Sequence, residues 1–93
     1  MRTVEYTRKF KRDYRREKSG RYAKDLDERL KAVLDLLVQD EPLPHNNFDH
    51  ALTGNWADHR DCHIRPDLVL IYRKTDDNGL QLVRLGSHSE LGL

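Results

Sequence analysis

The stretch from Leu68 to Arg73 limits the possible folds more than any other part of this chain. It opens with five successive apolar side chains, two of them β-branched, which predicts a buried strand. After a short polar segment comes Asn78-Gly79, the residue pair preferred in tight hairpin turns. Leu80 to Leu85 can then return as the partner strand. The chain is therefore expected to contain a β-hairpin built around a buried strand.

Two helices are expected before this hairpin. Thr7 is a suitable N-cap for a helix from Arg8 to Ser19, which Gly20 would end. A second helix is predicted from Tyr22 to Val38. Its apolar stripe has helical spacing and consists of Leu26, Leu30, Val33, Leu34 and Leu37. Because the predicted connection is short, the two helices should be antiparallel.

Two further extended segments complete the expected elements. Thr3 to Tyr6 alternates like a short strand, and Arg60 to Arg65 is strand-like and half polar. Between helices and hairpin, residues 41–55 read as a loop rich in Pro, Asn and Gly. The order β-α-α-β-β-β predicts an α+β fold, with two antiparallel helices on one face of a mainly antiparallel four-stranded sheet. With 93 residues, we expect a single domain over residues 1–93.

The charges are unevenly distributed, although the formal net charge is only +1. Residues 1–24 hold ten Lys or Arg against three acidic residues, whereas the remainder holds seven against thirteen. The basic segment indicates either a surface for a polyanion such as nucleic acid or a merely solvated helix face. No apolar run reaches membrane-spanning length, and the first residues do not resemble a signal peptide. Together with the single cysteine, Cys62, this favours a cytoplasmic protein without an internal disulfide.

Chemically useful side chains gather around the hairpin. Alternation along a strand puts Asp61, His63 and Arg65 on one face, while Cys62 and Ile64 should face the helices. The hairpin leaves Asp67 and His88 near the same end of the sheet. The residues that can meet on the open face are Asp61, His63, Asp67, Arg84 and His88.

This combination suits cleavage of RNA without a metal. The 2′-hydroxyl must lose a proton, the leaving 5′-oxygen must gain one, and the phosphorane needs a nearby cation. Histidine titrates in the required range, and guanidinium is an effective phosphate clamp. A basic helix beside the site would hold the RNA backbone through counterion release.

Other chemistries fit the same segment less well. A zinc site is disfavoured because the potential ligands alternate between the two faces of the strand and no second Cys-x-x-Cys half exists. Nucleophilic catalysis by Cys62 is disfavoured because its face should be packed. Trp56 is expected to seal an edge of the core rather than to stack on a base. We therefore expect neither a metal nor a cofactor.

Three motifs occur together in the correct order. They are HxLxGxW from His50, RDxHIxPDLVLIY from Arg60 and RLGSHSxL from Arg84. In these motifs, and over essentially the whole chain, the sequence resembles the YafQ-type branch of the RelE/ParE toxins. The resemblance implies a type II toxin–antitoxin toxin that inhibits translation as an mRNA interferase. Such an endoribonuclease cleaves mRNA at codons in the ribosomal A site.

The resemblance also implies partners. These are a cognate antitoxin, which is a DNA-binding dimer that wraps the toxin, and the 70S ribosome with its mRNA. Operator DNA would be contacted only through the antitoxin, and no membrane is involved.

The catalytic histidines and aspartate of the family match His50, His63, Asp67 and His88, and Asp61 and Arg84 match positions that resemble its active-site set. His88 is assigned as the general acid and Arg84 as the transition-state clamp. The base comes from among Asp61, His63 and Asp67, and His50 orients the substrate. The basic residues that resemble RNA or rRNA contacts are Arg8, Lys9, Lys11, Arg12, Arg15, Arg16, Arg21, Lys24 and Arg65.

One position departs from the family pattern. Related toxins commonly carry an aromatic residue four positions after the last histidine, and here that residue is Gly92. Stacking on an mRNA base is then either lost or supplied by Leu93 or Trp56. Two rival functions remain: a ParE-like toxin that inhibits DNA gyrase without catalysis, and a non-catalytic RNA-binding domain. Neither rival has a use for the histidine set.

Overall fold

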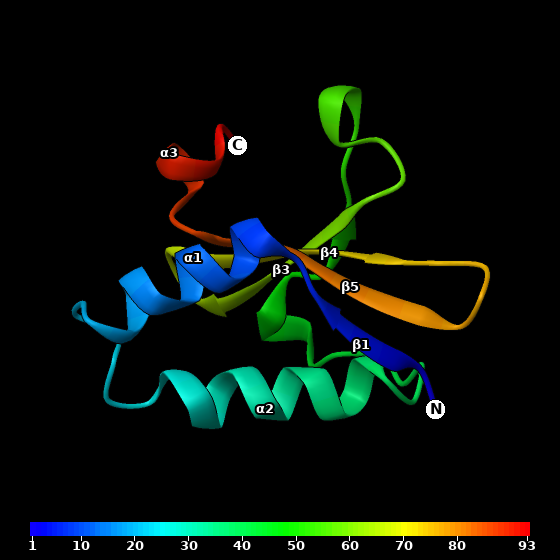
Figure 1. Cartoon of the computed structure of the whole chain (residues 1–93), viewed down its shortest axis with the longest axis horizontal. Coiled ribbons are helices and arrows are strands. Elements are labelled where there is room, and N and C mark those ends of the chain that lie inside the picture. The colour runs from blue at the N-terminus through cyan, green and yellow to red at the C-terminus, as the bar shows by residue number, and fades with distance from the viewer.

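A five-stranded sheet with strand order β1-β5-β4-β3-β2 forms the centre of the computed structural model, which describes residues 1–93 (Figure 1). The strands are β1 (Thr3–Tyr6), β2 (His50–Ala51), β3 (Arg60–Arg65), β4 (Leu68–Lys74) and β5 (Gly79–Gly86). β1 runs parallel to β5, and the other neighbours are antiparallel. The α+β class and the mainly antiparallel sheet are confirmed.

The expected number of strands was wrong by one. β2 has only two residues and lies in the segment predicted to be a loop, where it pairs with β3. Two residues are too few to show an alternating pattern, so the strand has no signal in the sequence. Its pairing matters for the site because it places His50 directly opposite Asp61.

The main helices are α1 (Arg8–Lys18) and α2 (Leu26–Leu37), and they run antiparallel (Figure 1). Thr7 caps α1 as expected, because its side chain accepts a hydrogen bond from the Phe10 amide. α2 begins at Leu26 instead of Tyr22, and turns connect the helices over residues 19–25. Tyr22 packs in this connection beneath the guanidinium of Arg21, 4.8 Å from the ring centroid. None of the helices is both long and apolar enough to span a membrane.

The main core lies between the helices and one face of the sheet. Its buried members include Phe10 of α1, the α2 stripe, and Cys62 and Ile64 of β3. A smaller cluster covers the opposite face, where Val69, Ile71 and Leu91 are buried against Trp56. Leu91 belongs to the short helix α3 (His88–Leu91), which lies across the sheet from α2 (Figure 1). β4 is thus covered on both faces, as its apolar sequence predicted.

The hairpin between β4 and β5 needs glycine for space rather than for its backbone angle. Asn78 takes the left-handed conformation at φ 69°, and Gly79 does not. A Cβ at Gly79 would instead collide with Thr75 Oγ1, which accepts the Gly79 amide hydrogen bond at 3.0 Å. The close approach of the Thr75 hydroxyl therefore explains the glycine.

We expect Gly79→Ala to lower the free energy of unfolding by about 1–3 kcal/mol, because Thr75 must move away from the methyl group and lose its hydrogen bond with the Gly79 amide. Gly20→Ala is the matched control, since its Cβ would lie 3.6 Å from two carbonyl oxygens, an ordinary contact. That control should change stability by less than about 0.5 kcal/mol. Urea denaturation measures both, and equal stabilities of the two variants would contradict the explanation.

Candidate active site

Five of the six predicted catalytic residues come together at the end of the sheet where α3 begins. His50 pairs with Asp61 across β2 and β3, and His63 follows two residues along the same face. His88 is the first residue of α3 and contacts both His63 and Asp67. The site is therefore assembled from segments separated by up to 38 positions in the chain.

His88 is held by Asp67. His88 Nδ1 lies 2.8 Å from Asp67 Oδ1, and the His88 amide donates to the same oxygen at 3.2 Å. An ionised carboxylate can only accept, so Nδ1 carries the proton and Nε2 remains for a substrate. The hydrogen bond from the ring lowers the pKa of Asp67, and the amide and the charge of Arg21 contribute less. The pair is thus a carboxylate-oriented histidine at the surface.

His63 stands beside His88 in the same surface. The two rings are 4.9 Å apart between centroids and meet edge to face. The Asn47 side chain donates to the carbonyl of His63 at 2.7 Å, which ties the preceding loop to β3. Two imidazoles in contact, one oriented by a carboxylate, can supply both a proton donor and a proton acceptor to one substrate.

Asp61 is buried rather than on an open face, with only 3% of its surface exposed. His50 covers it, and His50 Nδ1 is 3.1 Å from Asp61 Oδ1. The same nitrogen is 2.8 Å from the Phe48 carbonyl, and Asp61 Oδ1 accepts no hydrogen bond. Burial raises the pKa of Asp61 above its ordinary value of 3.8, and the neighbouring charge of His50 partly offsets this. Asp61 can therefore reach a substrate only through His50.

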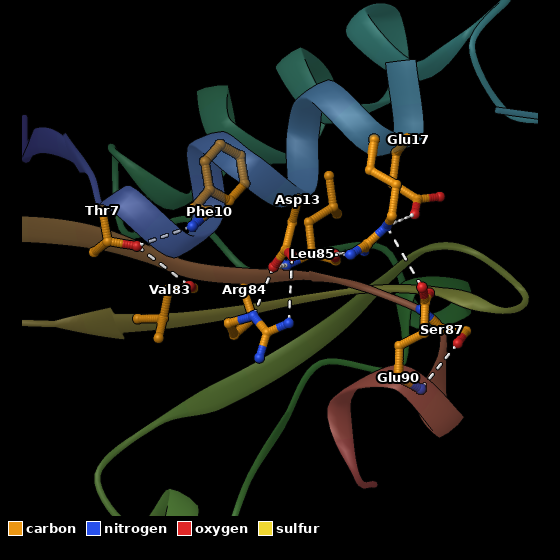
Figure 2. A network of polar contacts seen from close by, with 10 residues as sticks. Thr7, Phe10, Asp13, Glu17, Val83, Arg84, Leu85, Ser87 and Glu90 are labelled. Atoms are coloured by element: carbon orange, nitrogen blue, oxygen red, sulfur yellow. Dashed lines mark hydrogen bonds and ion pairs between the residues drawn. The ribbon is translucent and has the colours of Figure 1, made fainter. Parts of the chain in front are cut away.

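Arg84 is more restrained than the sequence suggested. Its Nε and Nη2 donate to the carboxylate of Asp13 at 2.6 and 3.3 Å, and the Leu85 amide donates to the same carboxylate at 3.0 Å. Asp13 is completely buried and reaches β5 from α1, as Figure 2 shows. Asp61 pairs with Ile71, which pairs with Arg84, so the two lie about 10 Å apart by strand spacing. Arg84 therefore lies beside the histidines and not among them.

Sequence reasoning missed Asp13, although one of only two acidic residues in a basic helix was a visible signal. Its neighbour Arg16 takes part in the same arrangement. Arg16 Nη2 donates to the Leu85 carbonyl at 2.9 Å, and its Nη1 lies 3.1 Å from Asp13. Thr7 Oγ1 donates to the Leu82 carbonyl at 2.8 Å. Side chains of α1 and of its N-cap thus form hydrogen bonds with backbone carbonyl groups along the edge of β5, near and beyond the end of β1.

The predicted RNA-binding residues divide into two groups. Arg16 and Arg65 are engaged within the protein: Arg65 Nη1 is 2.8 Å from Asp25, and its guanidinium lies 5.3 Å from the Tyr22 ring centroid. A bulge between His63 and Arg65 turns Arg65 away from the histidine face on which alternation had placed it. The remaining residues are exposed on α1 and in the following turns: Arg8, Lys9, Lys11, Arg12, Arg15, Arg21 and Lys24.

Cys62 and His59 lie outside the site. Cys62 is fully buried in the main core, and burial raises the pKa of its thiol, so the thiolate needed for attack is suppressed. His59 bonds the Ala57 carbonyl through Nδ1 at 3.0 Å, with its ring edge-on to Trp56. No three His, Cys, Asp or Glu side chains are grouped so as to hold a metal ion.

The loop before His50 contains residues that sequence reasoning overlooked. The Phe48 ring lies 5.2 Å from the His63 ring. Asp49 accepts hydrogen bonds from the Tyr72 hydroxyl and from Arg60 Nε, the latter at 3.3 Å. The available signal was an aromatic side chain in a largely polar loop, two residues before the HxLxGxW motif.

Known proteins are similar to this chain over nearly its whole length. The family model described as "Bacterial toxin of type II toxin-antitoxin system, YafQ" matches residues 2–92. The mRNA interferase toxin YafQ of Escherichia coli K12 is 39% identical over 85 residues, covering 81% of this chain and 91% of that protein.

Solved structures show the same fold. YafQ from E. coli BL21(DE3) superposes with a TM-score of 0.83 at 35% identity, covering 98% of both chains. A chain of the E. coli DinJ-YafQ complex superposes with a TM-score of 0.79 at 33% identity, again over 98% of both chains. The chain therefore belongs to the YafQ family of bacterial toxins of type II toxin–antitoxin systems.

Proposed function

We propose that this toxin is a ribosome-dependent endoribonuclease that cleaves mRNA at codons in the ribosomal A site and thereby inhibits translation. The observation that carries the proposal is the contact between His63 and His88, 4.9 Å between ring centroids, with His88 oriented by Asp67. Relatives that share the family and the fold are named mRNA interferases. This activity requires an acid and a base at one phosphate and no metal.

The geometry supports a division of roles. Asp67 is committed to His88 and Asp61 is buried, so His63 is the base among the three candidates. His63 takes the proton of the 2′-hydroxyl as its oxygen attacks phosphorus. His88 acts in the form that carries a proton on both ring nitrogens: Nδ1–H stays on Asp67, and Nε2–H gives its proton to the departing 5′-oxygen, which leaves a 2′,3′-cyclic phosphate and a 5′-hydroxyl. Electrons and protons balance without a further reactant.

Arg84 and His50 have supporting roles in this scheme. Arg84 Nη1 makes none of the Asp13 hydrogen bonds and is the part of the guanidinium able to meet developing phosphorane charge. His50 remains more than half exposed above Asp61 and orients the substrate at the β2 side of the site. The exposed cations of α1 and Arg21 contact the RNA or rRNA backbone.

The same proposal includes partners and location. The DinJ-YafQ structures are toxin–antitoxin complexes, and they support a cognate antitoxin for this chain. That antitoxin is a DNA-binding dimer that wraps the toxin and carries it to operator DNA. The other partners are the 70S ribosome and its mRNA, in the cytoplasm and without a membrane.

The test is cleavage by the purified chain of an mRNA positioned on 70S ribosomes, mapped by primer extension. We expect a cut within the A-site codon and little cutting of the same mRNA without ribosomes. A gyrase supercoiling assay with the same preparation should show no inhibition. Intact mRNA combined with gyrase inhibition would contradict the proposal and favour a ParE-like toxin. RNA binding without cleavage would favour the non-catalytic RNA-binding domain.

A further inference from the structure

Phe48 is difficult to explain as part of the fold. It is 58% exposed, although it is one of only two phenylalanines in the chain. Its backbone is left-handed, at φ 49° and ψ 43°, a conformation that a bulky side chain rarely adopts. Strain combined with exposure at a large apolar residue points to a role outside the folded core.

The loop nevertheless holds Phe48 in a defined place. On one side the Asn47 side chain donates to the His63 carbonyl at 2.7 Å. On the other side Asp49 accepts hydrogen bonds from the Tyr72 hydroxyl and Arg60. His50 Nδ1 lies 2.8 Å from the carbonyl of Phe48 itself. The ring is therefore presented by a segment anchored to β3 and β4.

Phe48 extends the histidine pair into a row of rings. The centroid separations along the row are 6.4 Å from His45 to Phe48, 5.2 Å from Phe48 to His63, and 4.9 Å from His63 to His88. Phe48 also lines two open hollows. One, of about 560 Å³, is lined partly by His63 and Arg65, and the other, of about 420 Å³, partly by His45 and His50.

We propose that Phe48 is a substrate-positioning residue on which a nucleobase of the mRNA stacks, next to the phosphate held by His63 and His88. The proposal rests on the nuclease function above. Unpaired bases bind proteins through stacking on aromatic side chains, and such stacking tolerates any base because every base has a π-face. The row of rings offers that surface at the place where the base adjoining the cleaved bond must lie.

The test compares three variants in the ribosome cleavage assay, at toxin concentrations below saturation. Phe48→Tyr keeps the ring and should cleave within about threefold of wild type. Phe48→Leu keeps apolar bulk without a ring, and Phe48→Gly removes the side chain. Both should lose about ten- to a hundredfold in rate, which corresponds to the loss of one stacked base.

Two controls separate stacking from folding. Phe48→Gly relieves the left-handed backbone, so its melting temperature should equal or exceed that of wild type while its activity falls. Tyr6→Leu removes another exposed aromatic ring, 49% exposed on β1, and should leave cleavage unchanged.

Three results would overturn the inference. Cleavage by Phe48→Leu as fast as by Phe48→Tyr would show that the ring is not needed. Loss of antitoxin binding with unchanged cleavage would make Phe48 a protein contact instead. A wild-type chain that does not cleave ribosome-bound mRNA would contradict both the nuclease function and the stacking role. If wild type is active and the Phe48 variants cleave as fast as wild type, only the stacking role is contradicted.

Discussion

Replacing His88 with alanine is expected to slow cleavage of ribosome-bound mRNA by about a hundred- to ten-thousandfold, the usual contribution of a positioned acid. Without His88 the 5′-oxygen must leave as an alkoxide, which water protonates poorly in the transition state. Single-turnover cleavage of mRNA on 70S ribosomes measures the rate directly. The fold should tolerate the change, because the His88 side chain is 40% exposed and α3 keeps its Ser87–Glu90 capping box.

A substrate with sulfur at the 5′ leaving position distinguishes acid from base. A thiolate departs without protonation, so this substrate should restore much of the activity of His88→Ala and none of that of His63→Ala. His59→Ala is the matched histidine control, since His59 bonds the Ala57 carbonyl and packs on Trp56 away from the site. If His88→Ala cleaves the natural substrate at the wild-type rate, or the thio substrate fails to rescue it, His88 is not the acid.

The elements with a regular pattern could be predicted from the sequence. The apolar run of β4, the stripe of α2 and the Thr7 cap each depend on residues close together in the chain, and each formed as expected. The start of α2 was wrong because Tyr22 has an apolar ring that fits a helical stripe. In the structure that ring instead contacts the guanidinium groups of Arg21 and Arg65.

The site could be predicted in part, because motif spacing and strand alternation are local properties. The burial of Asp61 could not be predicted, since it depends on β2 pairing beside β3 and placing His50 opposite Asp61. The direction of Arg65 depends on a bulge that leaves no mark in the sequence. The restraint of Arg84 depends on Asp13, 71 positions earlier. Each of these three features depends on contacts between separate segments of the chain. A periodic sequence pattern does not indicate such contacts.

Asp13→Asn is expected to have the largest effect on stability, lowering the free energy of unfolding by about 3–5 kcal/mol. Asp13 is completely buried and accepts hydrogen bonds from Arg84 and the Leu85 amide (Figure 2). Arg16 Nη1 lies 3.1 Å from the same carboxylate. An asparagine amide would leave a partly buried guanidinium without its counter-charge. A folded domain of this size has only about 5–14 kcal/mol in total. Urea denaturation at pH 7 measures the loss.

Asp35→Asn is the matched control, because Asp35 is exposed and pairs only with Lys31 across one helical turn of α2. It should cost no more than about 0.5 kcal/mol. If Asp13→Asn lowers the free energy of unfolding as little as Asp35→Asn does, the buried carboxylate is not a main contribution to the packing of α1 on β5. In that case Arg84 would have to be positioned by other contacts.

The pH dependence gives an independent check on Asp13. Burial alone would raise the pKa of Asp13, but the Arg84 hydrogen bond, the Leu85 amide and the two guanidinium charges together lower it below the ordinary 3.8. A group whose pKa is lower when folded stabilises the fold fully above its unfolded pKa and loses that contribution as pH falls through the folded pKa. The stability difference between wild type and Asp13→Asn should therefore be constant from pH 7 to about 5 and shrink below about pH 4. A difference that grows on acidification would mean that the carboxyl is protonated in the folded protein, and Arg84 would then lack the anion that holds it beside the histidines.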